Sequence, residues 1–156
     1  MNVAQTRINE EQLELYRRLL KQHSLKATPQ RLAVHQAMMS LKHASADMVC
    51  EWLEQHCNTH TTTTSVYNIL SQMALLGIYR HLMSANNKMF FDVNTYKHIH
   101  LYDITSHEFK DIMDDEMMAS IEERLKGKRF RGYKVDSVDI QIICHPSTKR
   151  TTNKKQ

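Results

Sequence analysis

The sequence predicts an α+β protein with two unlike halves, and three observations predict it. Apolar residues recur at helical spacing in four segments before residue 77, two short alternating segments follow up to residue 93, and a mixed pattern of strands and a helix occupies residues 94–147. We therefore expect an N-terminal domain over residues 1–93, a small α/β domain over residues 94–147 and a basic, disordered tail over residues 148–156.

The first two expected helices cover residues 9–22 and residues 29–41. The first has leucines and a tyrosine on one face and glutamates in its opening turn. The second opens with Thr28 and Pro29, which are a capping residue and a proline at the first helical position.

A third helix is expected after Ser45, whose hydroxyl suits an N-cap. The fourth follows a run of threonines at residues 61–64 and ends at Gly77. Residues 78–83 and 88–93 then alternate around the turn sequence Ser-Ala-Asn-Asn, which predicts a β-hairpin.

Short helices followed by a two-stranded wing are the layout of a winged helix-turn-helix, in which the helix before the wing enters the DNA major groove. A small helical domain with an incidental hairpin is the alternative that the pattern alone leaves open. Residues 1–46 carry seven Lys or Arg and three Asp or Glu. That excess favours a polyanion partner, although a solvated basic surface explains it equally well.

The second half predicts strands at residues 99–104, 108–113 and 133–144, with a helix over residues 114–126 and a basic connector over residues 126–132. A unit of about fifty residues is only marginally stable alone. We therefore expect dimerisation or metal binding to stabilise it.

Composition excludes several classes of protein. The three cysteines among 156 residues form no disulfide framework, which suits a reducing cytoplasm. None of the three glycines lies in a nucleotide-binding loop pattern. The chain has no apolar run that would span a membrane and no visible secretory signal, so we expect a cytoplasmic protein.

The strongest local motif is His98-Ile99-His100, followed by Asp111 on the next expected strand. Histidines two apart on a strand point to the same face, so both imidazoles can bind one ion together with the carboxylate. Such donors suit Fe(II), Mn(II), Zn(II), Co(II) or Ni(II). Two solvent-facing histidines are the alternative. A second group, Cys50, His56, Cys57 and His60, lacks a CxxC pair and is more typical of a helix end than of a zinc site.

Several motifs occur in an order that resembles the ferric uptake regulator family: LKATPQR at residues 25–31, HASAD at 43–47, SVYNIL at 65–70, GI at 77–78, FD at 91–92 and HIH at 98–100. Members of this family are dimeric winged-helix repressors that sense divalent metals or peroxide. The resemblance covers about residues 10–145.

The resemblance implies a sensory site for one divalent transition metal per subunit, Fe(II) or Mn(II) in function and Zn(II) as a substitute. Its ligands would be His43, Asp92, His98, His100 and Asp111. With aspartate at both carboxylate positions, Asp92 and Asp111, the chain resembles the peroxide-sensing branch of the family. One ion bound by all five would fix the angle between the two domains and thereby the spacing of the recognition helices in a dimer.

The sequence departs from the family where two CxxC pairs usually hold a structural zinc. The corresponding positions are Asp103 and Ser106, then Cys144 and Ser147, so we predict no four-thiolate zinc site and a buried strand-end role for Cys144.

The resemblance also implies DNA contacts in and before the recognition helix. Where the family commonly has Thr-Val-Tyr-Arg, this chain has Ser65-Val66-Tyr67-Asn68, and an asparagine pairs well with adenine. The expected DNA-binding residues are Lys26, Arg31, Thr62, Thr63, Thr64, Ser65, Tyr67 and Asn68. Each of them is equally well explained as an ordinary exposed polar residue.

Together these observations predict a homodimeric, metal-dependent transcriptional repressor of metal homeostasis or peroxide stress that binds a palindromic DNA operator. We expect no catalytic residues, no membrane partner and no small-molecule substrate. One alternative is a DNA-binding regulator that senses haem or redox state. Another is a non-haem iron enzyme built on His98, His100 and Asp111.

Overall fold

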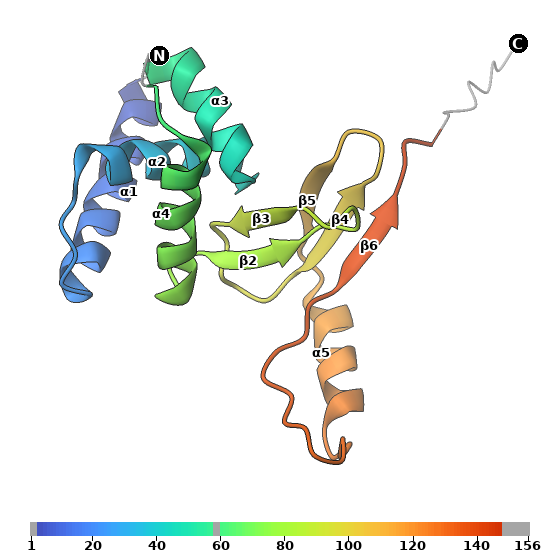
Figure 1. Cartoon of the computed structure of the whole chain (residues 1–156). Helices are drawn as coiled ribbons and strands as arrows, with labels where there is room; N and C mark the ends of the chain where they lie inside the picture. Colours follow the sequence, from blue (N-terminus) through green and yellow to red (C-terminus); the bar gives the residue numbers. More distant parts are fainter. Residues whose placement is uncertain (1–2, 58–59, 148–156) are drawn as a thin grey trace, which may run out of the picture. The chain divides into compact units, whose positions relative to one another are not determined.

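A computed structural model describes residues 3–57 and 60–147, with side chains from residue 10 onward (Figure 1). The chain divides into two compact units, unit 1 (Met1–Tyr96) and unit 2 (Lys97–Gln156). The tail predicted over residues 148–156 lies outside the described residues. No helix in the described part of the chain has both the length and the apolar character needed to cross a membrane.

Unit 1 begins with the four predicted helices, α1 (Val3–Gln22), α2 (Pro29–Leu41), α3 (Ala46–Cys57) and α4 (Thr63–Leu75). The side chain of Thr28 accepts a hydrogen bond from the Arg31 N–H at the start of α2, and Thr62 does the same for Ser65 at the start of α4. These bonds satisfy amide groups that the first turn of a helix leaves without partners. The N-cap predicted at Thr28 is therefore confirmed, Thr62 from the threonine run caps α4, and α1 starts earlier than expected. Ser45, predicted as the N-cap of α3, accepts a hydrogen bond of 3.4 Å from the Met48 N–H.

The apolar faces of the helices meet in one core. Its fully buried side chains come from all four helices and include Tyr16, Leu20, Val34, Met38, Val49, Leu53, Val66, Leu70 and Met73. This packing fixes α4, the predicted recognition helix, against the rest of unit 1.

The wing contains one strand more than the sequence predicted. Strands β2 (Arg80–Met83) and β3 (Met89–Asp92) form the expected hairpin, and β1 (His43–Ala44) pairs with β3 to give the antiparallel order β1-β3-β2. A two-residue strand is too short to show alternation. It forms because Lys42 adopts φ 66° directly after α2 and turns the chain onto β3.

Unit 2 is a three-stranded sheet with one helix. The order is β5-β4-β6, in which β4 (Ile99–Asp103) pairs antiparallel with β5 (Glu108–Ile112) and parallel with β6 (Gln141–Cys144), while α5 (Asp115–Leu125) lies between β5 and β6 in the chain. Helices followed by a small sheet domain confirm the predicted α+β class.

The predicted strand over residues 133–144 is wrong in its extent, because only its last four residues pair with β4. Val135, which precedes the paired residues of this segment, is 50% exposed. The expected burial of Cys144 is also wrong, because this residue at the end of β6 is only half-buried.

Candidate functional site

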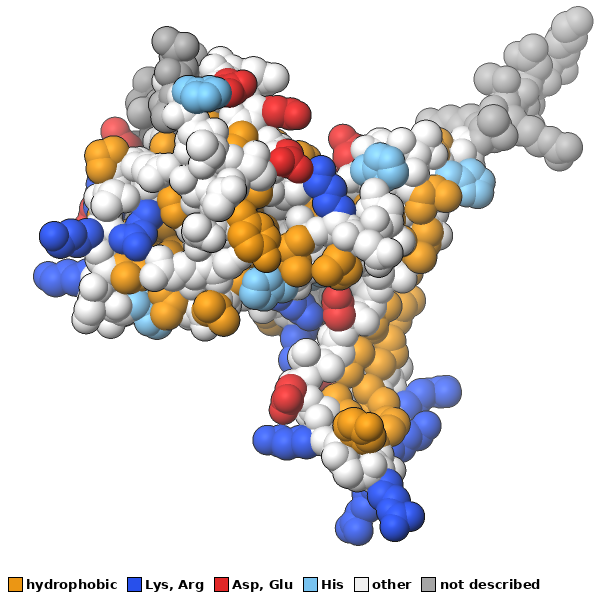
Figure 2. Space-filling model, in the orientation of Figure 1, with side chains coloured by type: hydrophobic (Ala, Val, Ile, Leu, Met, Phe, Trp, Pro, Cys, Tyr) orange, Lys and Arg blue, Asp and Glu red, His pale blue; other side chains and the backbone are white. Residues whose placement is uncertain are grey.

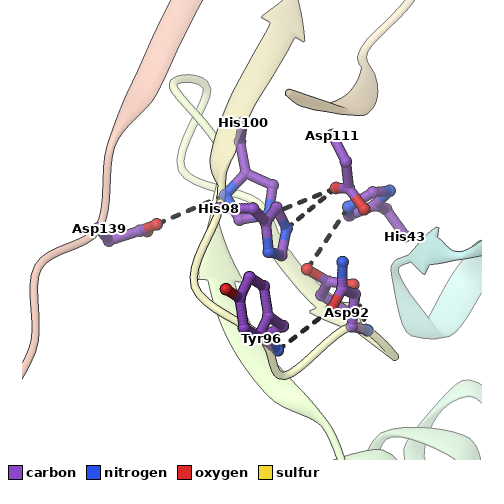
Figure 3. A network of polar contacts seen from close by, with 8 residues as sticks. His43, Asp92, Tyr96, His98, His100, Asp111 and Asp139 are labelled. Carbon is purple, nitrogen blue, oxygen red and sulfur yellow. Dashed lines mark hydrogen bonds and ion pairs between the residues drawn. The ribbon is translucent and has the colours of Figure 1, made fainter. Parts of the chain in front are cut away.

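His43 and Asp92 are brought together inside unit 1 by the pairing of β1 with β3. The two residues are direct cross-strand partners, and His43 Nε2 lies 3.5 Å from Asp92 Oδ2 (Figure 3). Asp92 Oδ1 accepts a hydrogen bond of 2.7 Å from the Asn94 N–H, which orients the carboxylate. Unit 1 therefore offers one imidazole and one fixed carboxylate.

His98, His100 and Asp111 are brought together inside unit 2. His100 and Asp111 are cross-strand partners, His98 precedes β4 on the same face, and the two imidazole centroids are 4.3 Å apart. Asp111 Oδ1 lies 3.0 Å from His98 Nε2 and 3.9 Å from His100 Nε2 (Figure 3). One ligand atom from each of the three residues lies within 4.8 Å of the others.

These distances suit a divalent transition metal. Metal–nitrogen and metal–oxygen bonds of roughly 2.0–2.2 Å place two ligand atoms of one ion about 3–4.4 Å apart. The three ligand atoms of unit 2 reach this range with small adjustments. Two imidazoles and a carboxylate suit Fe(II), Mn(II) and Zn(II), so the residues fit the group that the sequence implied.

Asp139 is a polar partner of this cluster that the sequence analysis missed. Its Oδ1 lies 3.5 Å from His100 Nδ1, the ring nitrogen opposite the one nearer Asp111 (Figure 3). The neighbouring Ile140 carbonyl accepts a hydrogen bond from the His100 N–H, so Asp139 is held beside β4. A carboxylate on the second nitrogen fixes the tautomer and orientation of a ligating histidine. Only the parallel pairing of β4 with β6, which the sequence does not reveal, places Asp139 here.

The exposed face of α4 is the candidate DNA surface. Thr64 and Asn68 are exposed, and Tyr67 is 43% exposed with its ring edge against Phe91 of β3. The first turn of α4 contains no acidic residue, so nothing in it neutralises the positive end of the helix dipole. Such a helix start favours phosphate groups.

Other predicted DNA-binding residues have roles within unit 1. Arg31 donates hydrogen bonds to the Lys26 carbonyl at 2.8 Å and to Gln72 Oε1 of α4 at 3.0 Å. Thr62 caps α4 through Ser65, and Thr63 Oγ1 lies 3.9 Å from Cys50 Sγ. The side chain of Lys26 is exposed. Arg31 and Thr62 thus position α4, whatever else they contact.

A buried polar group lies in the core of unit 1. The His35 ring stacks on Tyr16 at 3.9 Å, and its Nδ1 is 2.7 Å from the Tyr79 hydroxyl. Burial lowers the pKa of His35 from 6.5 to about 4, so its imidazole is neutral at pH 7.

Three of the positions that correspond to the thiol pairs, Asp103, Ser106 and Cys144, lie at a hydrogen-bonded corner of unit 2. Asp103 and Cys144 are register partners on β4 and β6. Asp103 Oδ1 accepts hydrogen bonds from the backbone N–H groups of Thr105 at 2.8 Å and Ser106 at 3.4 Å. The bond from Thr105, followed by the weaker bonds from Ser106, lowers the pKa of Asp103 and stabilises the turn before β5.

In the cysteine and histidine group at residues 50–60, Cys50 is half-buried and Cys57 is exposed. Burial raises the pKa of Cys50, and its thiol donates to Thr63 Oγ1. His60 Nδ1 lies 3.0 Å from Glu54 Oε1, so its nearest polar partner is a carboxylate.

Comparisons with known proteins agree on one family. Residues 22–143 match the model of the ferric uptake regulator family. The structure is similar to the ferric uptake regulator of Vibrio cholerae, with 20% identity, TM-score 0.70 and coverage of 84% of this chain and 99% of that chain.

Two further solved structures are similar. The ferric uptake regulator Fur of Helicobacter pylori, whose structure shows three functional metal-binding sites, has 21% identity and TM-score 0.66 over 88% of this chain and 91% of that chain. The Campylobacter jejuni peroxide stress regulator has 24% identity and TM-score 0.61 over 85% of this chain and 96% of that chain. No curated protein sequence matches the chain significantly.

Proposed function

The chain belongs to the ferric uptake regulator family of metal-responsive transcriptional regulators, and on that premise we propose that one divalent ion bound by both units controls its hold on DNA. The proposed ligands are His43 and Asp92 from unit 1 with His98, His100 and Asp111 from unit 2. The regulator acts as a repressor in the cytoplasm, and Fe(II) or Mn(II) is the proposed physiological ion.

One observation carries this proposal: each unit has too few ligands for an ion by itself, and a short segment of chain, between Asp92 and His98, joins the two ligand sets. First-row divalent ions take about four to six ligand atoms, whereas unit 1 offers two residues and unit 2 offers three. Asp92 and His98 are six residues apart, and a chain of that length spans at most roughly 20 Å. The two sets are therefore tethered close enough to share an ion.

The bound ion supplies a bond between the two units. His43 and Asp92 are part of the wing, which follows the recognition helix α4, so holding them holds α4 as well. In a dimer built on unit 2, the two α4 helices must match half-sites about one DNA turn apart. Sharing the ion favours the arrangement that meets this spacing, provided that the ion binds that arrangement more tightly than the others.

The histidine geometry does not favour haem. Axial ligands of a haem iron approach from opposite faces of the porphyrin. His98 and His100 instead converge on one carboxylate oxygen, with ring centroids 4.3 Å apart, and a porphyrin does not fit between them.

We assign base contacts to Tyr67 and Asn68 and phosphate contacts to Thr64, because these side chains are exposed on α4. Lys26, Thr63 and Ser65 contribute near the helix start, while Arg31 and Thr62 mainly hold α4 in place. The proposed operator is a palindromic duplex.

We place the dimer interface on unit 2. Its surface exposes many large apolar side chains, among them Ile104, Met113, Met117, Ile142 and Ile143. Burying them in a second copy would supply the core that a unit of this size lacks.

The decisive experiment is a DNA-binding titration. Duplexes are selected from a random library in the presence of Mn(II), and affinity is then measured by fluorescence anisotropy with Mn(II) or with EDTA. We expect Mn(II) to raise affinity at least tenfold and His98→Ala to abolish that gain.

His23→Ala is the matched control, because His23 is exposed and lies outside the proposed ligand set. Affinity that is the same with Mn(II) and EDTA would contradict the proposed role of the ion. Elemental analysis of the purified protein identifies the ion that is bound.

Aspartate at positions 92 and 111 supports peroxide sensing as a refinement of this function. In that case the Fe(II)-loaded protein, treated with hydrogen peroxide, gains one oxygen atom on a peptide containing a ligand histidine. Mass spectrometry detects this gain, and the Mn(II)-loaded protein serves as the control. Unmodified peptides together with intact metal-dependent repression would place the chain outside the peroxide-sensing branch.

A further inference from the structure

Unit 2 concentrates its positive charge in one segment. The nine residues KGKRFRGYK at 126–134 carry five Lys or Arg and no acidic residue, whereas the rest of residues 93–147 carries three Lys or Arg and ten Asp or Glu. We call residues 126–134 the basic loop. Such separation is not what a uniformly solvated surface gives, and a basic segment within an otherwise acidic domain is typical of a surface that binds polyanions.

The basic loop has a defined conformation. It starts directly after α5, whose C-cap is Lys126, and it contains a turn in which the Tyr133 N–H donates to the Phe130 carbonyl at 2.9 Å. Gly132 allows this turn because it adopts φ 81°, which side-chain-bearing residues rarely take. The loop lines a cavity of about 490 Å³ together with Leu125 and Val135.

Four cations of the loop are available for a ligand. Lys126 is paired with Glu123 at 2.8 Å. Within the described residues, Lys128, Arg129, Arg131 and Lys134 make no ion pair, and all four are exposed. Figure 2 shows Lys and Arg side chains beside hydrophobic ones at the C-terminal end of α5.

Two aromatic rings alternate with these cations. Phe130 is 45% exposed and Tyr133 is 83% exposed. An intact duplex offers these rings no bases to stack on, because its bases are stacked inside the helix. Unpaired bases stack on exposed aromatics while Lys and Arg bind the phosphates of the same strand.

We propose that the basic loop binds single-stranded nucleic acid, independently of the metal and of the duplex-binding face on α4. Lys128, Arg129, Arg131 and Lys134 contact phosphates, and Phe130 and Tyr133 stack on bases. The site uses residues of unit 2 alone.

The test is fluorescence anisotropy of the full-length protein with labelled 20-nucleotide oligo(dT) and oligo(U), in EDTA. We expect binding to weaken with salt with a slope of about −3, because each phosphate contact on a single strand contributes about −0.7. Arg129→Gln with Arg131→Gln should reduce the slope by about 1.4, while Phe130→Ala with Tyr133→Ala should lower affinity at least about fivefold and leave the slope unchanged.

The matched control is Lys149→Gln with Arg150→Gln, which removes the same charge from the tail. An equal loss in this control would overturn the proposal, as would tighter binding to a duplex of random sequence or to vesicles of anionic lipid. Metal-dependent duplex binding is measured in parallel. The loop variants should retain it, so failure of this proposal is distinguishable from failure of the proposed repressor function.

Discussion

Unit 1 and unit 2 bury their apolar side chains to different extents. In unit 1, all four helices contribute fully buried residues to one core, including Leu53 and Leu70. Among the residues of unit 2 that the structure describes, the buried apolar side chains are Ile99, Tyr102, Phe109 and Met118, and both isoleucines of β6 are exposed. Unit 1 therefore has the core of an independent domain, whereas unit 2 depends on a further surface or ligand.

The largest effect is expected from a substitution that creates a cavity in the core of unit 1. Leu70→Ala removes a fully buried side chain of α4 and should destabilise unit 1 by about 2–5 kcal/mol. Urea denaturation followed by fluorescence reports on this unit alone, because the single tryptophan, Trp52, lies in α3. Leu75→Ala, at an 82% exposed position of the same helix, should change the free energy of unfolding by less than about 0.5 kcal/mol. Equal losses in the two variants would mean that α4 is not packed as described.

Metal should stabilise unit 2 by a comparable amount. Mn(II) at 100 times its Kd adds about 2.7 kcal/mol to the folded state. Hydrogen exchange in β4 should slow accordingly, since His100 is part of that strand. His100→Ala should remove the metal-induced slowing, whereas His145→Ala, at an exposed position after β6, should keep it. Slowing that persists in His100→Ala would exclude this residue as a ligand.

Unit 1 should lose stability in mild acid through His35. The pKa of His35 is about 4 in the folded protein and 6.5 in the unfolded chain. Below pH 6.5 the unfolded chain therefore binds a proton at His35, whereas the folded protein binds it only near pH 4. Stability is therefore complete above pH 6.5, and about 2 kcal/mol is lost between pH 7 and pH 5. Urea denaturation followed by Trp52 fluorescence measures this loss. His35→Gln should flatten the pH dependence, while His23→Gln should leave it unchanged.

The helices of unit 1 were predictable because each has both a periodic apolar face and a local end signal. Thr28 and Thr62 cap helices through hydrogen bonds to residues three positions away. Such local caps can be predicted from the residue types at the start of a helix. By contrast, β1 is defined by pairing with β3, more than forty residues later, and by the positive φ of Lys42. Neither is visible in local sequence.

In the candidate site, too, some residues were predictable from local sequence and one depends on the pairing of distant strands. The HxH spacing places His98 and His100 on one face, and Asp111 follows on the adjacent strand, so local pattern was sufficient. Asp139 approaches His100 only because β6 runs parallel to β4, and the sequence instead suggested one long strand over residues 133–144. Only residues 141–144 of that segment form a strand, and Val135 in the part before them is exposed.

Of the four predictions, the substitution of Asp139 should have the smallest effect. It tests whether a residue outside the proposed ligand set orients the ligand His100. Asp139→Asn keeps the shape of the side chain but removes the charge facing His100 Nδ1, 3.5 Å away. Loss of such a partner costs about 10–100-fold in metal affinity, and the lower end is expected because the Asp139 side chain is 43% exposed. Competition titration with a chelating dye measures the Kd for Co(II), and the Co(II) absorption spectrum reports on the ligand geometry. Asp136→Asn, a neighbouring exposed carboxylate, is the control. An unchanged Kd and spectrum in Asp139→Asn would mean that this carboxylate has no role in metal binding, whereas a shifted spectrum with weaker binding would identify it as the residue that positions His100.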